Sequence, residues 1–303
     1  MADHLNEALE FASSIRTKAL AAGPDAIAVD PLFEEDPKAA KILEFGIKRR
    51  KNVLIVGDTG CGKSSLAINV AARLGEKIEP CNLDGETSTG NLIGDVALIN
   101  KDGSTITQVV HGAALRAYRD GKILLLEEVD FANPDILASL HRLMETQSGF
   151  YVCNVGGAGE VIKRHPLYCV VATANTIGTG EDSFVYSGTK PLNQAFMNRF
   201  SLTVRMDYLP ADKEAKVVAA KSGLTTHHTK QLVECANEVR TARKTASNRQ
   251  LTATISTRDL IEWAGLINGT NMEPLEAAGY CFLNRVNEAD RDVIIDFIKN
   301  RVR

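Results

Sequence analysis

Short apolar runs that alternate with helical patterns dominate the first two thirds of the chain. Three of these runs are apolar on both faces and partly β-branched, which predicts buried parallel strands. They are "NVLIVG" from residue 52, "KILLLEEVD" at 122–130 and "YCVVATAN" at 168–175. The run "SLTVRMDYL", which begins at residue 201, predicts a further strand. Together the runs indicate a parallel sheet that helices cover on both faces.

Helical patterns separate the apolar runs. Asp36 followed by Pro37 is typical of a helix N-cap and a first helical position, so we expect a helix that extends to about Arg50. A second helix is predicted after Lys63 and a third over residues 134–147, which begin with a proline.

Glycine-rich and polar segments predict two hairpins and a loop. Residues 85–112 predict strands and turns with a hairpin tip at 100–103, and residues 149–164 predict a second hairpin with a glycine-rich turn. Residues 176–190 are rich in Gly, Thr and Ser and predict a loop. At the other end of the chain, apolar residues at helical spacing predict a short amphipathic helix over 4–22.

After Pro210 the chain changes to mostly helical patterns. We therefore expect an α/β protein in three parts. They are an N-terminal helical extension at 1–35, a nucleotide-binding α/β core at 36–209 and a smaller α-helical lid at 210–303.

Composition adds limits on the kind of protein. The chain has 303 residues, a net charge of −3 and a pI of about 6.1, so a basic surface for non-specific nucleic-acid binding is not expected. The first twenty residues lack the pattern of a secretory signal, and no apolar run reaches the roughly 20 residues of a membrane span. Six scattered cysteines without a C-x-x-C pair indicate reduced thiols, and we expect a cytoplasmic protein without a membrane partner.

A glycine-rich segment follows the first apolar run and opens a helix. It is Gly57, Asp58, Thr59, Gly60, Cys61, Gly62, Lys63, Ser64, followed by Ser65. The spacing matches G-x-x-x-x-G-K-[ST], whose backbone N–H groups cradle phosphates. In this cradle Lys63 would reach the β- and γ-phosphates, and Ser64 would place its hydroxyl on Mg²⁺. The alternative is a glycine turn that merely ends a strand.

Polar residues also follow the other apolar runs. Glu127 would help to hold Mg²⁺ and Glu128 would polarise the attacking water, in a strand that we expect beside the cradle. Asn175 would hydrogen-bond the γ-phosphate or the lytic water. The alternatives are an acidic strand end and a turn asparagine.

Two further residues each allow two interpretations. Arg199, in "MNRFSL", would reach the γ-phosphate of a neighbouring subunit, or it forms a surface salt bridge. Cys61 lies near Lys63 and a helix N-terminus, which would lower the pKa of its thiol and make it reactive; otherwise it is an inert small residue.

These motifs, in this order and before a helical lid, resemble the AAA+ ATPases. The predicted hairpins, near 91–112 and 150–163, are similar to the insertions of the MoxR branch, one inside the helix after the second strand and one before the strand that carries Asn175. Within that branch the chain resembles the CobS group, the ATPase subunits of aerobic cobaltochelatases. The resemblance covers about residues 37–303, and its main stretches are "HPLYCVVATANTIGTGED", "YSGTKPLNQAFMNRFSLTVRMDYLP", "DKEAKVVAAKSG" and "STRDLIEWA".

The resemblance implies a homo-oligomeric ring, a hexamer, with ATP and Mg²⁺ at subunit interfaces. It implies a partner that carries a von Willebrand A domain, or a chelatase subunit. It also gives roles to single residues: Lys63, Ser64, Glu127 and Glu128 form the Walker motifs, Asn175 is sensor 1, Arg199 the arginine finger and Arg258 sensor 2. Without the resemblance, Arg258 reads as an arginine at a helix start.

The chain departs from the family pattern at Glu127, where the family usually has aspartate. Its extra methylene shifts the carboxylate by roughly one C–C bond length. We expect the site to tolerate this shift with slower turnover, since Mg²⁺ keeps several of its waters. The first 35 residues show no clear match to the CobS group.

Three functions remain open at this stage. The first is a motor that uses ATP hydrolysis to remodel a partner. The second is a nucleotide-dependent binding module with little turnover, which Glu127 keeps open. The third, a nucleic-acid motor, is disfavoured by the acidic charge balance and by the lack of an aromatic and basic patch.

Overall fold

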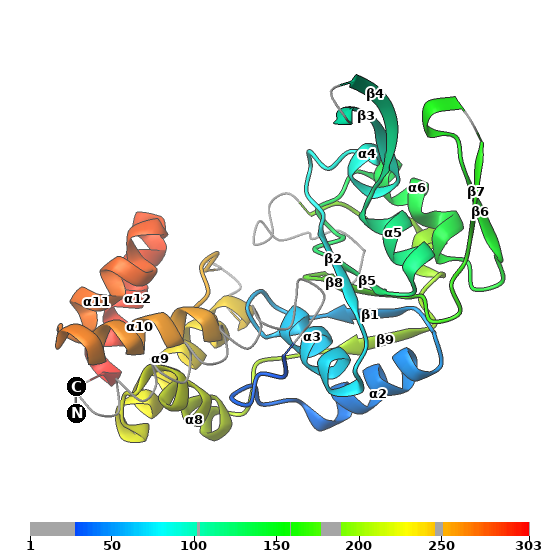
Figure 1. Ribbon diagram of the computed structural model, residues 1–303. Coiled ribbons are helices and arrows are strands. Elements are labelled where there is room, and N and C mark those ends of the chain that lie inside the picture. Colours follow the sequence, from blue (N-terminus) through cyan, green and yellow to red (C-terminus); the bar gives the residue numbers. More distant parts are fainter. Residues whose placement is uncertain (1–27, 102–103, 158, 177–188, 246–250, 303) are drawn as a thin grey trace.

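The computed structural model describes residues 28–101, 104–157, 159–176, 189–245 and 251–302 (Figure 1). Three sequence predictions therefore lie partly or wholly outside the described residues. They are the helix at 4–22, the centre of the first hairpin tip and most of the loop at 176–190.

The centre of the molecule is a five-stranded parallel sheet with the strand order β2-β5-β8-β1-β9. Its strands are β1 (Val53–Val56), β2 (Ile78–Asn82), β5 (Ile123–Glu127), β8 (Cys169–Ala174) and β9 (Leu202–Arg205). The four strands predicted from apolar runs are confirmed. The edge strand β2 was not predicted, because its sequence IEPCN contains a proline and only its first residue is fully buried.

Helices cover both faces of the sheet (Figure 1). Side chains of β1 alternate: Val53 and Ile55 pack toward α2 (Pro37–Lys48) and α3 (Lys63–Leu74). Leu54 and Val56 pack toward the opposite layer. That layer contains α4 (Thr89–Leu92), α5 (Ala113–Asp120), α6 (Pro134–Met144) and α7 (Gln194–Met197).

The predicted start of α2 is confirmed. The Asp36 carboxylate accepts hydrogen bonds from the backbone N–H groups of Lys38 at 2.8 Å and Ala39 at 2.9 Å, and Pro37 opens the helix. The helix ends at Lys48, two residues before the predicted end.

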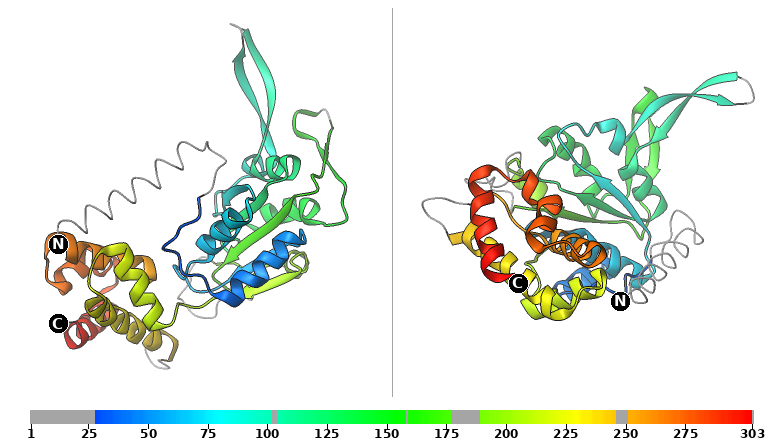
Figure 2. Two further views of the ribbon diagram at one scale, coloured as in Figure 1. Left: turned by 60° about the horizontal axis from the view of Figure 1, so that its bottom comes forward. Right: turned by 90° about the vertical axis from the view of Figure 1, so that its left-hand side faces the viewer.

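Both predicted hairpins are present. β3 (Gly94–Lys101) pairs with β4 (Ser104–His111), and the pair stands between α4 and α5. β6 (Phe150–Cys153) pairs with β7 (Glu160–Lys163) around a short turn, η1 (Val155–Gly157). Figures 1 and 2 show that the hairpins project from the α/β part on the side away from the C-terminal helices.

The residues after Pro210 form helices around a hydrophobic cluster of their own, which contains the fully buried Trp263. The helices are α8 (Ala211–Ser222), α9 (Thr226–Thr245), α10 (Thr257–Thr270), α11 (Pro274–Cys281) and α12 (Glu288–Arg301), with the short η3 (Leu283–Arg285). The domain boundaries themselves stay a prediction. Among the described helices, none combines the length and apolar character needed to cross a membrane.

Candidate nucleotide site

The glycine-rich segment forms a tight loop between β1 and the first turn of α3. Gly60 (φ +69°) and Gly62 (φ +94°) adopt left-handed backbone conformations, which side-chain-bearing residues rarely adopt. A Cβ on Gly60 would also stand 2.3 Å from the Cβ of Ser256, just before α10. The loop therefore needs glycine both for its curvature and for its contact with the C-terminal helices.

Lys63 begins α3 and its side chain points into the loop. Its ammonium donates hydrogen bonds to the carbonyl oxygens of Gly57 at 2.7 Å and Asp58 at 3.0 Å, and to Oδ1 of Asn175 at 2.9 Å. Burial lowers the pKa of Lys63, although nearby acidic groups oppose that shift. A phosphate at this place would supply the negative charge that a buried ammonium needs.

Two carboxylates lie at the same end of the sheet, where Glu127 ends β5 and Glu128 follows it. Glu127 is half-buried and Glu128 is exposed, and neither side chain has a hydrogen bond or ion pair to the residues described. Glu128 has φ +60°, a left-handed conformation that is rare for a residue with a long side chain. Its backbone N–H donates to the hydroxyl of Thr173 on β8 at 3.2 Å, which helps to hold this turn.

One expectation about this strand was wrong. We expected the strand with the two glutamates to lie beside the cradle, but β1 pairs with β8 and β9, and β8 separates it from β5. Asn175, which follows β8, is therefore the nearer of the predicted groups, and it contacts Lys63 directly. Glu127 and Glu128 lie about two strand spacings, roughly 10 Å, from the β1 axis.

One polar residue at this end of the sheet, Asp130, was not predicted from the sequence. Asp130 is fully buried, and its Oδ2 accepts hydrogen bonds from the backbone N–H groups of Asn175 and Thr176 and from the Thr176 hydroxyl. The signal in the sequence is weak: a third acidic residue, two positions after Glu128, that only the fold shows to be buried.

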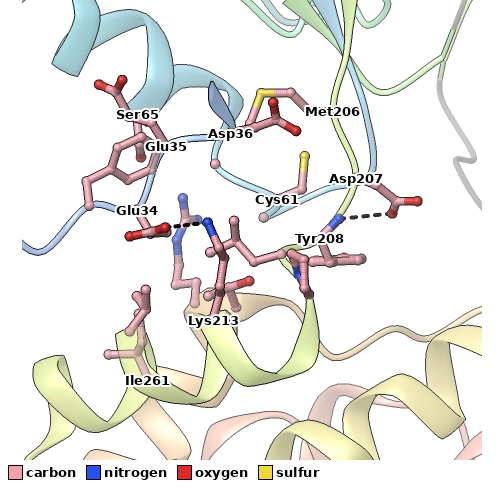
Figure 3. A pocket seen from close by; sticks show the side chains of 18 of the residues that line it. Glu34, Glu35, Asp36, Cys61, Ser65, Met206, Asp207, Tyr208, Lys213 and Ile261 are labelled. Atoms are coloured by element: carbon pink, nitrogen blue, oxygen red, sulfur yellow. Dashed lines mark hydrogen bonds and ion pairs between the residues drawn. The ribbon is translucent and has the colours of Figure 1, made fainter. Parts of the chain in front are cut away.

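A cavity of about 470 Å³ lies next to the cradle, a size suited to a small ligand (Figure 3). Gly60, Cys61, Gly62 and Ser65 line one side, together with residues 33–37. Helices α8 and α10 line the other side, and Lys213 of α8 forms an ion pair with Glu34 at 2.7 Å, as Figure 3 shows.

Arg258, in the first turn of α10, lines the same cavity. Its side chain is exposed and has no ion pair within the described part of the chain. The structure therefore places Arg258 in the wall of the cavity next to the cradle.

The cradle also contacts the end of α9. The carboxylate of Asp58 lies 3.7 Å from Arg243 and 3.6 Å from Lys244, and the Tyr208 hydroxyl donates to the carbonyl oxygen of Thr59 at 2.7 Å. These contacts of the cradle with α9 and with Tyr208 were not predicted from the sequence, because they join segments far apart in the chain.

Cys61 lies in the cavity wall but is itself buried. Burial raises the pKa of the Cys61 thiol, and the opposing charge of Lys63 does not reverse that shift. This direction favours the inert alternative over the reactive one. All six cysteines are free.

Arg199 does not join the other predicted residues. The backbone N–H of Ser201 donates to the carbonyl oxygen of Asn52, just before β1, so this segment lies at the amino end of the sheet. The Arg199 guanidinium donates to the carbonyl oxygens of His141 at 3.1 Å and Ala195 at 2.5 Å. It also lies 3.5 Å from the carboxylate of Glu145, so the ion pair of the alternative interpretation is present. The length of β1, roughly 13 Å, separates this end from the cradle.

The oxygen atoms at the carboxyl end of the sheet fit a magnesium ion bound together with phosphates. Ser64 stands in the first turn of α3, and Glu127 carries an unpartnered carboxylate among the described residues. No group of three or more His, Cys, Asp or Glu suited to a metal occurs in the described ranges. Mg²⁺ in phosphate sites needs only one or two protein ligands, so these donors suffice.

The fold and this site define a P-loop nucleotide-binding protein. Two family models match the chain: the AAA domain of the dynein-related subfamily at residues 52–200 and the CbbQ/NirQ/NorQ C-terminal domain at residues 214–295. Over 272 residues the chain is 33% identical to the aerobic cobaltochelatase subunit CobS of Sinorhizobium sp, covering 88% of this chain and 79% of that protein. The chain belongs to the MoxR-type AAA+ ATPases and is close to CobS.

Other similarities are more distant. An uncharacterized protein of Staphylococcus haemolyticus is 28% identical over 230 residues, which cover 75% of this chain and 81% of that protein. A mutant of RuvB from Thermotoga maritima is similar in structure, with a TM-score of 0.50, 13% identity and coverage of 87% and 68%. At this identity the RuvB similarity shows the fold alone.

Proposed function

We propose that the chain is a Mg²⁺-dependent ATPase of a homo-oligomeric ring, a hexamer, that uses ATP hydrolysis to remodel a partner. The observation that carries the proposal is the contact between Lys63 and Asn175, at 2.9 Å. It joins the phosphate-binding loop to the residue that follows the neighbouring strand, so a terminal phosphate near Lys63 would also meet Asn175.

Each residue then has a part in hydrolysis. Lys63 binds the terminal phosphates, and Asn175 orients the γ-phosphate or the water beside it. Glu128 polarises that water and accepts its proton. Bound Mg²⁺, held by Ser64 and Glu127, would neutralise charge on the phosphates. Arg258 stabilises phosphate charge from the lid side.

The position of Arg199 supports a role between subunits. It lies at the sheet end opposite the cradle of its own subunit, so it cannot reach a nucleotide there. In a ring, the amino end of one sheet can face the cradle of the next subunit. Arg199 would then stabilise the charge that develops on the neighbour's γ-phosphate.

The hairpins support a protein partner. In the described part of the chain, seven of the twelve exposed large hydrophobic side chains are on them: Val96, Leu98, Ile106, Val110, Phe150, Val152 and Val161. Apolar residues on projecting ribbons indicate a protein contact surface. The similarity to a cobaltochelatase subunit suggests a chelatase complex or a protein with a von Willebrand A domain, in the cytoplasm.

A second candidate is a nucleotide-dependent binding module with little turnover. Glu127 favours it, because the longer side chain places the metal-side carboxylate differently from aspartate. We propose no nucleic-acid partner, in line with the net charge of −3.

The test is steady-state ATP hydrolysis by the wild type and the Glu128→Gln variant, with and without Mg²⁺. We expect Mg²⁺-dependent turnover that falls about 10²- to 10⁴-fold in the variant, because a general base is lost. The particle mass, recorded with and without ATP, should show a ring that the variant retains. Glu86→Gln, at an exposed glutamate, is the matched control and should hydrolyse ATP normally.

The outcomes separate the two candidates. Normal hydrolysis by Glu128→Gln would exclude Glu128 as the base. Assembly with ATP but no turnover, even after addition of candidate partners, would favour the binding module.

A further inference from the structure

Asp130 is an acidic residue that the proposed mechanism does not use, although it lies within the site. Its Oδ2 accepts three hydrogen bonds, from the N–H of Asn175 at 2.9 Å, the N–H of Thr176 at 3.0 Å and the Thr176 hydroxyl at 3.2 Å. These bonds fix the main chain directly after β8. They therefore also fix the root of the Asn175 side chain, which contacts Lys63.

The other carboxylate oxygen of Asp130 has a different environment. Oδ1 is buried and has no hydrogen-bond partner among the described residues. A buried carboxylate oxygen without a donor destabilises a fold, so such atoms need an explanation. Holding the chain after β8 requires only Oδ2. The second oxygen thus keeps an unused acceptor position, which a donor can reach only when nucleotide binding opens space beside it.

The surroundings of Asp130 indicate which donor this is. The residue stands two positions after Glu128, the proposed base, and its Oδ2 holds Asn175, the proposed ligand of the γ-phosphate. Burial lowers the pKa of Lys63, and the negative charge of Asp130 is among the influences that oppose this shift. A phosphate oxygen would be repelled by Oδ1, whereas a water molecule between these groups can donate to it.

We propose that Asp130 orders a water molecule in the hydrolytic site: Oδ2 anchors the carboxylate to the chain after β8, and Oδ1 accepts a hydrogen bond from that water. This inference rests on the proposed ATPase function. Asp130 is a positioning residue, and Glu128 remains the base.

The test uses two variants of the full chain that change opposite sides of the carboxylate. Asp130→Asn can keep an acceptor at the place of Oδ2, while its NH₂ group turns the acceptor at Oδ1 into a donor. Thr176→Val removes one donor to Oδ2 and leaves Oδ1 unchanged. We expect kcat to fall at least about tenfold in Asp130→Asn with KM for ATP within about threefold. Thr176→Val should keep kcat within about threefold.

A second readout does not require turnover. A fluorescent ADP with aluminium fluoride mimics the transferring phosphate and its in-line water, and it should stay trapped on the wild type and Thr176→Val. Asp130→Asn should bind fluorescent ATP normally but fail to trap this mimic. Thermal unfolding of all three proteins checks that they fold.

Several results would overturn the inference. One is a folded Asp130→Asn variant with the kcat and the trapping of the wild type. Another is an equal loss of kcat in Asp130→Asn and Thr176→Val, which would show that the carboxylate is only a structural anchor. A wild type that traps the mimic but never turns over would refute the proposed ATPase, and the trapping comparison would still test Asp130. A wild-type protein that neither traps the mimic nor hydrolyses ATP would refute both the proposed ATPase function and the proposed role of Asp130.

Discussion

The two ends of the parallel sheet differ in what their polar groups contact. At the carboxyl end, Glu127 and Glu128 have no side-chain partner in the described residues, and Lys63 is buried beside a cavity. At the amino end, Asn52 donates to the carbonyl oxygens of Met144 and Arg199, and its Oδ1 accepts from the N–H of Val170. The carboxyl end thus carries two carboxylates without a partner among the described residues, whereas at the amino end the Asn52 amide is bonded to the backbone on both sides.

This difference suggests how one chain can contribute two half-sites. A guanidinium that acts on a neighbouring subunit must be fixed before the neighbour arrives, because ordering it later costs conformational entropy. The Arg199 side chain would meet this need: two backbone carbonyl groups and the Glu145 carboxylate orient it, and it is still 23% exposed.

Among the variants that compare the two ends of the sheet, the largest expected effect concerns Arg199. In Arg199→Ala, turnover should fall about 10³-fold while ATP affinity stays near the wild-type value, because the charge stabilisation from the neighbour is lost. Mixing this variant with Lys63→Ala should restore part of the activity, since each mixed interface then pairs an intact cradle with an intact arginine. ATP hydrolysis of the mixture against each variant alone is the measurement.

Arg199→Lys is the companion variant, because it keeps a positive charge and lowers the risk of misfolding. It should remain largely inactive, since lysine lacks the planar fork. Absence of any rescue in mixtures that form rings would contradict action between subunits.

The next effect tests the carboxyl end. Lys63→Ala should weaken ATP binding by about 100-fold or more, because charge-assisted hydrogen bonds to the phosphates are lost. Lys51→Ala is the matched control, since this exposed lysine precedes β1 at its amino end. Equilibrium titration with a fluorescent ATP measures both. Equal affinities for the two variants would refute the cradle assignment.

The smallest effect concerns Glu127. Glu127→Asp, which introduces the residue usual in the family, should raise turnover by no more than about threefold, because Mg²⁺ bound through water tolerates a shift of its carboxylate. A Mg²⁺ titration of ATP hydrolysis measures the change. An increase beyond about tenfold would show that the carboxylate contacts the metal directly.

The sequence predicted features that depend on local chemistry. Asp36 and Pro37 predicted the start of α2, and the glycine spacing predicted the loop before α3. The sequence could not predict that β8 lies between β1 and β5, because strand order depends on how distant segments pack. Asp130 was missed for the same reason: its three donors are on the residues directly after β8, 45 and 46 positions further along the chain.

The ion pair of Glu214 and Arg240 shows a similar limit. Both side chains are almost fully buried and are joined at 2.7 and 2.9 Å, although 26 positions separate them. Neither residue stands out in the helical pattern. Such pairs become visible only when α8 and α9 are placed together.

The backbone of Glu128 has a consequence for how this protein can change. Its left-handed conformation costs roughly 1 kcal/mol that a glycine would not incur. A chain with glycine at 128 would therefore tend to be more stable, yet it would lack the carboxylate that we propose as the base. Selection for stability and selection for turnover act in opposite directions at this position. If Glu128 is the base, the sharp turn at this position keeps a catalytic group at the expense of the fold.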